Sequence, residues 1–304
     1  MAETPQGIKI ELETQSRRGK NRLPKRLPDP TGIAREYRAF IRSIADEYDK
    51  ALKEILYPAL EVAANQQKGQ RLDGWFETLT RALDQMEFRA AAITEGLRPK
   101  MIEFADKLGK FNQAQFQRAI NSTWGVNVSL NENWINDELK SWAEVNSKLV
   151  SSVPANAQTD VARIAQEGVR SGRNVRDIQS EIQERFNVQR NRAQTIARTE
   201  TAKLNSELSK RRQTELGIDT YYWSTSRDER VRGSDTNARP GDYHDVLDGM
   251  LCRWDDPTVY SDDGGATWKS RSSIGAYIGD PGTDYNCRCT SRANTESLLK
   301  ALGV

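Results

Sequence analysis

The sequence predicts an α+β protein, in which a region of long helices is followed by a small, irregular, β-containing C-terminal domain. Apolar residues recur at helical spacing as far as Gly217, and beyond it glycine, aspartate, serine and threonine become frequent. The composition, with 37% hydrophobic and 29% charged residues, indicates elongated helices with thin cores or surfaces that partners cover. A length of 304 residues suits about two domains.

Residues 1–28 are predicted to be a basic, flexible arm without a helical or strand period. Its cations follow one another without an intervening acid: Arg17, Arg18, Lys20, Arg22, Lys25 and Arg26. Such a run is able to neutralise phosphates or an acidic partner surface, and it is also typical of a solvated arm. The net charge of +2 shows that the chain as a whole is not a polycation.

Residues 29–155 are predicted to be a helical region that docks on a partner. Pro30 and Thr31 suit a helix start, and an apolar stripe continues that helix to Leu56, with a kink expected at Pro58. Further helices are expected over 75–93, 99–122, 130–150 and 156–170.

Residues 156–304 are predicted to form the C-terminal domain. Its helices occupy 156–217, with a break at Ser171-Gly172 and separate helices over 174–186 and 188–216. A part made of short strands and long loops follows over 218–292, and a short helix is expected near Ser297-Leu298-Leu299.

All three cysteines and the single histidine fall in this domain, at His244, Cys252, Cys287 and Cys289. Such a group is typical of a zinc site with three cysteines and one histidine, but C-x-C is tighter than the usual C-x2–4-C spacing. An odd cysteine count and an N-terminus without a secretory signal favour a reducing cytoplasm over disulfides. We expect no cofactor and buried thiols that pack a loop-rich corner, with zinc as the alternative.

Glu200 lies on the apolar stripe of its predicted helix, four residues from both Ile196 and Leu204. A buried carboxylate needs a partner, because its desolvation is costly. Arg230 and Arg232 would share one face of a strand. We therefore predict an ion pair between Glu200 and one of these arginines, and a general acid or base at Glu200 is the alternative.

Three patterns resemble enzyme motifs. The stretch from Ser261 to Trp268, SDDGGATW, fits the Asp-box of sialidases, which is a hairpin turn and not a catalytic element. Arg198 followed by Ser224-Thr225-Ser226 has the order found in ADP-ribosyltransferases, but the Glu-x-Glu or Gln-x-Glu that those enzymes need is absent beyond it.

The third pattern is His244 with aspartates at 242 and 245, which is typical of a metal-dependent nuclease only when a second histidine or a patterned acid cluster accompanies it. A loop histidine with local hydrogen bonds is the simpler interpretation. We therefore expect a protein that is not an enzyme.

Four motifs in order carry a resemblance to a known family: IARTETAKLN (196–205), DERVR (228–232), His244 with LDG (247–249), and NCRC (286–289). Over residues 160–292 the chain resembles the Mu F-like phage head morphogenesis family, the minor head proteins of tailed bacteriophages. The resemblance marks these residues as the structural core of the domain: Arg198, Thr199, Glu200, Asp228, Arg230, Arg232, His244, Gly249, Asn286, Cys287, Arg288 and Cys289.

The resemblance implies a virion protein that is assembled in the host cytoplasm and acts in head assembly at the portal vertex, with a role in packaging or ejection of DNA. Its expected partners are the portal protein, the major capsid or scaffold proteins and double-stranded DNA, and no membrane. The expected contacts are the basic residues of the arm together with Lys210, Arg211 and Arg212. A virion-delivered enzyme, either an ADP-ribosyltransferase or a zinc-dependent one, and a DNA-binding protein are the alternatives.

Overall fold

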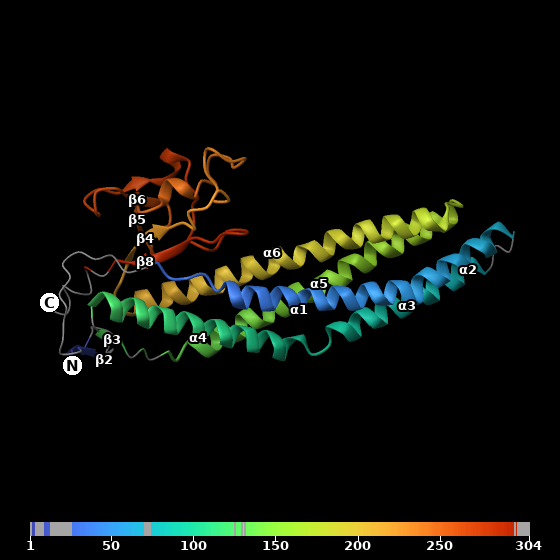
Figure 1. Ribbon diagram of the computed structural model, residues 1–304, viewed down its shortest axis with the longest axis horizontal. Coiled ribbons are helices and arrows are strands. Elements are labelled where there is room, and N and C mark those ends of the chain that lie inside the picture. The colour runs from blue at the N-terminus through green and yellow to red at the C-terminus, as the bar shows by residue number, and fades with distance from the viewer. Residues whose placement is uncertain are drawn as a thin grey trace. The chain divides into compact units, whose positions relative to one another are not determined.

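The computed structural model describes residues 2–3, 9–12, 26–69, 74–124, 126–128, 130, 132–294 and 296. The described chain divides into two compact units. The helical unit comprises Ala34–Phe104 and Lys140–Ala197, and the mixed unit comprises Met1–Ile33, Ala105–Leu139 and Arg198–Val304. Long helices and a small sheet in the C-terminal third confirm the predicted α+β class (Figure 1).

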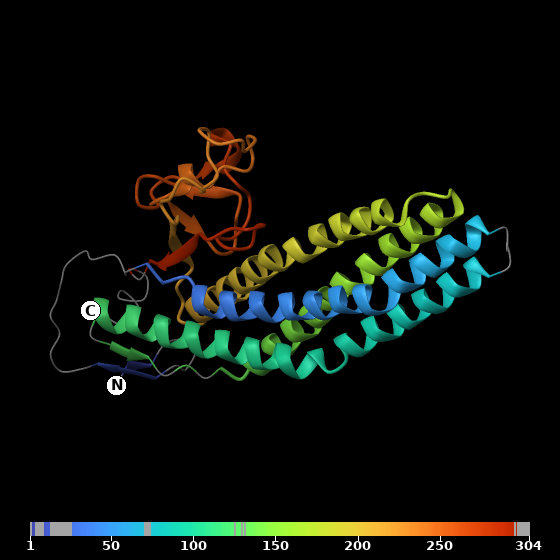
Figure 2. The same cartoon turned by 45° about the vertical axis from the view of Figure 1, so that its right-hand side comes forward.

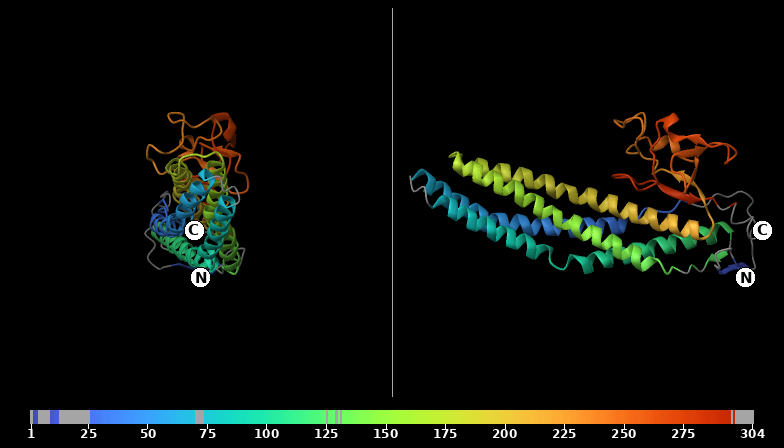
Figure 3. Two further views of the ribbon diagram at one scale, coloured as in Figure 1. Left: turned by 90° about the vertical axis from the view of Figure 1, so that its right-hand side faces the viewer. Right: turned by 180° about the vertical axis from the view of Figure 1, so that it is seen from behind.

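The helices of the described chain are α1 (Thr31–Ala51), α2 (Tyr57–Lys68), α3 (Trp75–Thr94), α4 (Leu97–Trp124), α5 (Ile135–Arg170) and α6 (Val175–Glu215). Within the helical unit they run lengthwise alongside one another (Figures 1 and 3). The expected irregularity at Pro58 is a π-helical turn over Leu52–Leu56, directly before α2. A π turn changes the hydrogen-bonding pattern of that stretch from i→i+4 to i→i+5 but does not end the helix. The chain therefore continues directly into α2.

Two predicted helix boundaries are wrong. The chain runs without a break from 135 to 170 and from 175 to 215, so the expected gaps near 150–156 and 186–188 do not exist. Pro154 lies inside α5 and is buried between Val153 and Ala157. Burial of this apolar stretch offsets the backbone hydrogen bond that the proline removes. The expected domain boundary at residue 155 therefore falls within a helix.

The core of the helical unit joins apolar packing to a few buried hydrogen bonds. The Tyr37 ring packs against Phe104 and Trp142, with ring centroids 5.1 and 5.7 Å apart. Its hydroxyl donates to Asn146 Oδ1 at 2.9 Å in the interior. About three turns further along α1 and α5, the Tyr48 hydroxyl donates to Gln158 at 2.6 Å. These contacts tie the unit together at widely spaced points.

The turn between α5 and α6 lies at Ser171-Gly172, where the sequence predicts a break between helices. Gly172 has φ +68°, and the amides of Gly172 and Arg173 donate to the carbonyls of Val169 and Gly168. This is the Schellman arrangement that ends many helices. A Cβ on Gly168 would lie 2.6 Å from Ile178, so only glycine lets the two helices meet there.

The mixed unit contains two antiparallel sheets. The larger has the strand order β7-β6-β5-β4-β8, built from Lys269–Ser270, Val259–Ser261, Leu251–Arg253, Thr220–Ser224 and Thr290–Ala293. Figure 2 shows these short strands within long loops. The smaller sheet has the order β1-β2-β3, from Ala2–Glu3, Lys9–Leu12 and Val126–Val128.

Within the predicted flexible arm over 1–28, β2 pairs with β3 far along the chain, so residues 9–12 lie in a sheet. The predicted final helix near Ser297 lies outside the described residues. In the part of the chain that the structure describes, no helix combines the length and apolar character needed to cross a bilayer.

Candidate functional site

The NCRC turn places two thiols on one side of the backbone. Asn286 has φ +60°, a left-handed conformation that asparagine tolerates. Cys287 and Cys289 then lead into β8, and alternate residues of an extended segment point the same way. Both cysteines are buried, and the Cys289 amide donates to the Cys287 sulfur at 3.3 Å. The tight C-x-C spacing therefore brings two sulfurs to one interior point.

His244 faces both sulfurs. Its Nδ1 lies 3.4 Å from Cys287 Sγ and 3.5 Å from Cys289 Sγ. Its ring stacks on Tyr277 at 4.9 Å and meets the Trp223 ring edge-on at 5.8 Å. The backbone amide of His244 donates to Arg232 O at 2.8 Å, which fixes the loop that carries it. We call His244, Cys287 and Cys289 the Cys–Cys–His cluster.

Asp284 connects this cluster to Arg232. Its Oδ2 lies 3.1 Å from His244 Nε2 and also accepts from the Arg232 guanidinium. A second nitrogen of Arg232 donates to the Tyr285 carbonyl oxygen. Because the carboxylate pairs with a guanidinium, we assign the His244 proton to Nε2 and the lone pair to Nδ1.

The two thiols do not ionise alike. The Cys289 thiol donates to the sulfur of Cys287, and this hydrogen bond holds the pKa of Cys287 well below the usual thiol range. The same hydrogen bond and burial raise the pKa of Cys289. The cluster therefore favours a thiolate at Cys287 that accepts a hydrogen bond from the thiol of Cys289.

The other family-motif residues bind around this turn. Arg198 donates to Asn286 Oδ1 at 3.4 Å, and Thr199 Oγ1 accepts from the Asn286 amide at 3.0 Å. Arg288 pairs with Asp228 at 2.5 Å. Gly249, with φ +82°, lies further along and donates its amide to the Trp223 carbonyl at the edge of β4. The structure thus brings together motifs that are far apart in sequence.

The predicted ion pair between Glu200 and an arginine of DERVR is wrong. The salt bridge of Glu200 is with Lys203, three residues along the same helix, at 3.0 Å. Arg230 pairs with Asp228, and Arg232 with Asp284. Residues 228–232 form bends and turns in place of the expected strand, so the two arginines do not share one face.

Cys252 lies apart from the cluster, so the zinc site of three cysteines and one histidine, which was the alternative interpretation, is not assembled. Among the described residues, the group that could hold a metal ion consists of His244, Cys287 and Cys289, with ligand atoms within 4.8 Å of one another. Burial raises the pKa of Cys252 to about 11. All three cysteines are buried, and none of them is joined in a disulfide.

The basic residues proposed for DNA or partner contact have partners within the chain. Arg212 is fully buried, where it pairs with Glu132 at 2.5 Å and donates to Asn112, so it is not a surface contact. Lys210 pairs with Asp280, and Arg211 lies over the Trp134 ring at 5.1 Å. Arg26 donates to the Arg288 carbonyl at 3.0 Å. Arg17, Arg18, Lys20, Arg22 and Lys25 lie outside the described residues.

The hairpin expected at the Asp-box is confirmed. Strands β6 and β7 pair antiparallel on either side of it. Asp263 accepts from the Thr267 amide at 3.0 Å and from its hydroxyl at 2.5 Å, and Ser261 accepts from the Gly265 amide. These side chains tie the turn to itself, which is the structural role expected from the sequence.

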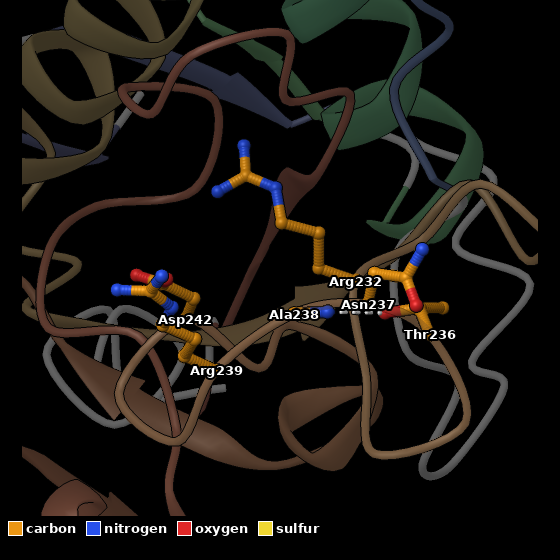
Figure 4. Close-up of a pocket in the computed structure, with 6 residues that line it drawn as sticks. All are labelled: Arg232, Thr236, Asn237, Ala238, Arg239 and Asp242. Atoms are coloured by element: carbon orange, nitrogen blue, oxygen red, sulfur yellow. Dashed lines mark hydrogen bonds between the residues drawn. The ribbon is translucent and has the colours of Figure 1, made fainter.

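A cavity of about 470 Å³ opens among the turns between Arg232 and Asp242. Its lining residues are Arg232, Thr236, Asn237, Ala238, Arg239 and Asp242. Figure 4 shows Arg239 and Asp242 on one side of it and Thr236 with Asn237 on the other. Thr236 Oγ1 accepts from the Ala238 amide at 3.2 Å. The turn that lines this side of the cavity is therefore stabilised by a hydrogen bond between its own residues.

Sequence reasoning missed two residues that hold this region together, the half-buried Asp284 and the buried Arg271. Asp284, which orients His244, lies three residues before Cys287. The sequence signal in this stretch comes from the two cysteines, and a single aspartate beside them does not indicate a contact with His244. Arg271 is fully buried and donates to the carbonyls of Val259, Tyr277 and Gly279 and to the Tyr221 hydroxyl. A lone arginine between serines carries no sequence signal for such burial.

These contacts define a domain of long helix, short strands and loops whose motif side chains bind one another. Residues 159–292 match the family described as Phage Mu protein F like protein. The resemblance expected from the motifs is therefore confirmed for this segment, which is a phage Mu protein F-like region.

One curated relative is an uncharacterized protein of Haemophilus influenzae (strain ATCC 51907 / DSM 11121 / KW20 / Rd), 26% identical over 195 residues. The alignment covers 62% of this chain and 38% of the relative, so the chain spans well under two thirds of the length of that protein. No solved structure matches the chain.

Proposed function

We propose that this chain is a structural, non-enzymatic component of a tailed-phage head, with a role in head assembly. The match of residues 159–292 to the phage Mu protein F-like family carries the proposal. The contacts of the motif residues support it, because Arg232, Arg288 and Arg198 hold Asp284, Asp228 and Asn286 of the same domain. Side chains used in this way keep a loop-rich part rigid, which suits a protein built into a particle.

The finer proposal is a minor head protein at the portal vertex, whose helical unit binds the portal protein or the major capsid or scaffold proteins. Exposed aromatic side chains on α3 support a partner surface: Phe88 is 75% exposed and Phe76 is 54% exposed. Aromatic residues are enriched in the interfaces of protein complexes, so these two side chains are the candidate contacts for such a partner.

Deleting the gene from the phage that encodes it tests the head-assembly role. We expect few or malformed heads, normal particles after complementation, and the protein in purified particles at far fewer copies than the major capsid protein. Normal, infectious particles without the protein would contradict the proposal.

Copurification tests the finer proposal. The tagged chain is expressed with portal, scaffold and major capsid proteins one at a time, and we expect it to retain the portal protein. The matched variant Phe88→Ser is expected to lose this partner while it stays folded. If the chain retained the capsid protein alone, the proposed role in head assembly would still stand, but the proposed location at the portal vertex would be contradicted.

A role in packaging or ejection would add contact with DNA. Binding that depends on phosphate contacts falls steeply as salt rises. Arg212 is buried, so Arg212→Gln is expected to unfold the mixed unit and not to change the salt dependence selectively. Equal DNA binding at low and high salt would contradict a phosphate-based contact.

A further inference from the structure

We propose that the Cys–Cys–His cluster binds one zinc ion, through Cys287 Sγ, Cys289 Sγ and His244 Nδ1. The proposal is independent of the head-assembly role, because it rests only on side chains of the mixed unit. Cys252 lies outside the cluster, so the described residues of the group supply three ligands.

The distances fit a zinc site. Zinc binds cysteine sulfur at about 2.3 Å and histidine nitrogen at about 2.0–2.1 Å in tetrahedral geometry, which sets sulfur and nitrogen about 3.6 Å apart. The observed separations between His244 Nδ1 and the two sulfurs are 3.4 and 3.5 Å. The histidine nitrogen therefore lies at the separation expected for ligands of one ion from each sulfur, and all three atoms lie within 4.8 Å of one another.

The surroundings of the histidine fit as well. Histidine ligands of metals usually donate their other ring N–H to a carboxylate, which fixes the tautomer and the ring orientation. Here Asp284 holds Nε2 at 3.1 Å, and Arg232 holds Asp284 in turn. Asp284 is at the far end of the imidazole from the sulfurs, so it orients the ligand and does not bind the same ion.

The three residues of the cluster are buried, whereas chance groups of potential metal ligands are common among exposed residues. The residue exposures are 2% for His244, 5% for Cys287 and 6% for Cys289. Trp223 packs on the same group, and its buried indole N–H faces the Cys289 sulfur closely enough to stabilise the thiolate form of that residue. Thiolates bound to a cation would offer that N–H a strong acceptor nearby.

Zinc would act here as a cross-link. His244 follows the loop that begins at Arg232, and the cysteines follow the turn that begins at Asp284. Both segments are turns and loops, so few backbone hydrogen bonds join them. A metal bond between them would supply rigidity that a larger apolar core supplies elsewhere.

Metal analysis of the full chain, purified with a reductant, tests the proposal. We expect about one zinc per chain in the wild type and in the matched control Cys252→Ser. Cys287→Ser, Cys289→Ser and His244→Gln are each expected to lose it. Zinc that persists in these three variants, or that is lost in Cys252→Ser alone, would overturn the assignment.

Cobalt substitution keeps the test valid where a variant fails to fold. Cobalt(II) added to the metal-free wild type is expected to give the intense visible bands of a tetrahedral site and sulfur charge-transfer bands in the near ultraviolet. Asp284→Asn should weaken metal affinity about 10–100-fold without abolishing the bands. A folded wild type that binds neither zinc nor cobalt, or a Cys287–Cys289 disulfide found by mass spectrometry in the reduced preparation, would contradict the site.

Discussion

The helical unit and the turn-rich part of the mixed unit are stabilised in different ways. In the helical unit, buried apolar side chains spread along continuous helices, with occasional hydrogen bonds such as that between Tyr37 and Asn146. Around β4–β8 the strands are only two to five residues long, and buried charged and polar side chains join the loops. Short strands bury little apolar surface, so specific side-chain bonds carry more of the stability there.

The largest expected effect is the loss of a buried guanidinium from the mixed unit. Arg271→Ala leaves the carbonyls of Val259, Tyr277 and Gly279 without their donor. We expect the free energy of unfolding to fall by about 3–5 kcal/mol, measured by urea denaturation. The control Arg253→Ala removes a half-exposed arginine paired with Asp255 and should cost less than about 1 kcal/mol. Equal losses in the two variants would remove the distinction between the regions.

The next effect is a loss of stability in alkali. Burial raises the pKa of Cys252 to about 11 in the folded protein, above the value of a thiol in the unfolded chain. The unfolded state therefore ionises first, and stability present below pH 9 is lost as the pH rises toward 11. We expect this thiol to contribute about 2–3 kcal/mol to that loss.

Comparing wild type with Cys252→Ala isolates this contribution, because other groups titrate in both proteins. The variant should lose less stability between pH 8 and pH 11, measured by denaturation at each pH. Parallel curves for the two proteins would show that the Cys252 thiol does not titrate as predicted.

A smaller effect is expected in the helical unit. Tyr37→Phe keeps the ring packing and removes only the hydroxyl that donates to the buried Asn146. We expect a loss of about 1 kcal/mol in the free energy of unfolding. Tyr285→Phe, at a side chain that is 61% exposed, serves as the control and should change nothing measurable. A loss as large as that of Arg271→Ala would mean that single polar contacts matter equally in both units.

The smallest effect on stability is expected at Phe88. Because its ring is 75% exposed, Phe88→Ser should change the free energy of unfolding by less than about 0.5 kcal/mol. Loss of helical circular dichroism or a lower melting temperature would show that Phe88 stabilises the fold. That outcome would end its use as a probe of a partner surface.

The long helices were predictable because their signals are local. The apolar stripe after Pro30, the glycines at 172 and 217 and the turn chemistry of Ser261 and Asp263 each act over a few neighbouring residues. The boundaries that failed, at Pro154 and near Phe186, are places where packing along the helix overrides a local signal.

The ion pairs were not predictable in the same way. Glu200 was expected to need an arginine, but Lys203 on its own helix pairs with it. Arg212, read from its neighbours as part of a basic surface, is enclosed by Asn112 and Glu132 from distant segments. Burial of a charged residue depends on which segments fold over it, and that information is not contained in its sequence neighbourhood.

By itself the sequence determined the α+β class, the helical path of the chain and the family of residues 159–292, since apolar periodicity and ordered motifs are properties of neighbouring positions. Only the tertiary structure decided that His244 meets Cys287 and Cys289 while Cys252 stays apart, and that Asp284 and Arg232 hold the histidine in place. The physical reason is that irregular turns, such as the one with the left-handed Asn286, set the direction of side chains, and the spacing of residues in the sequence does not predict that direction. Contacts across forty or more residues arise from the packing of the whole unit.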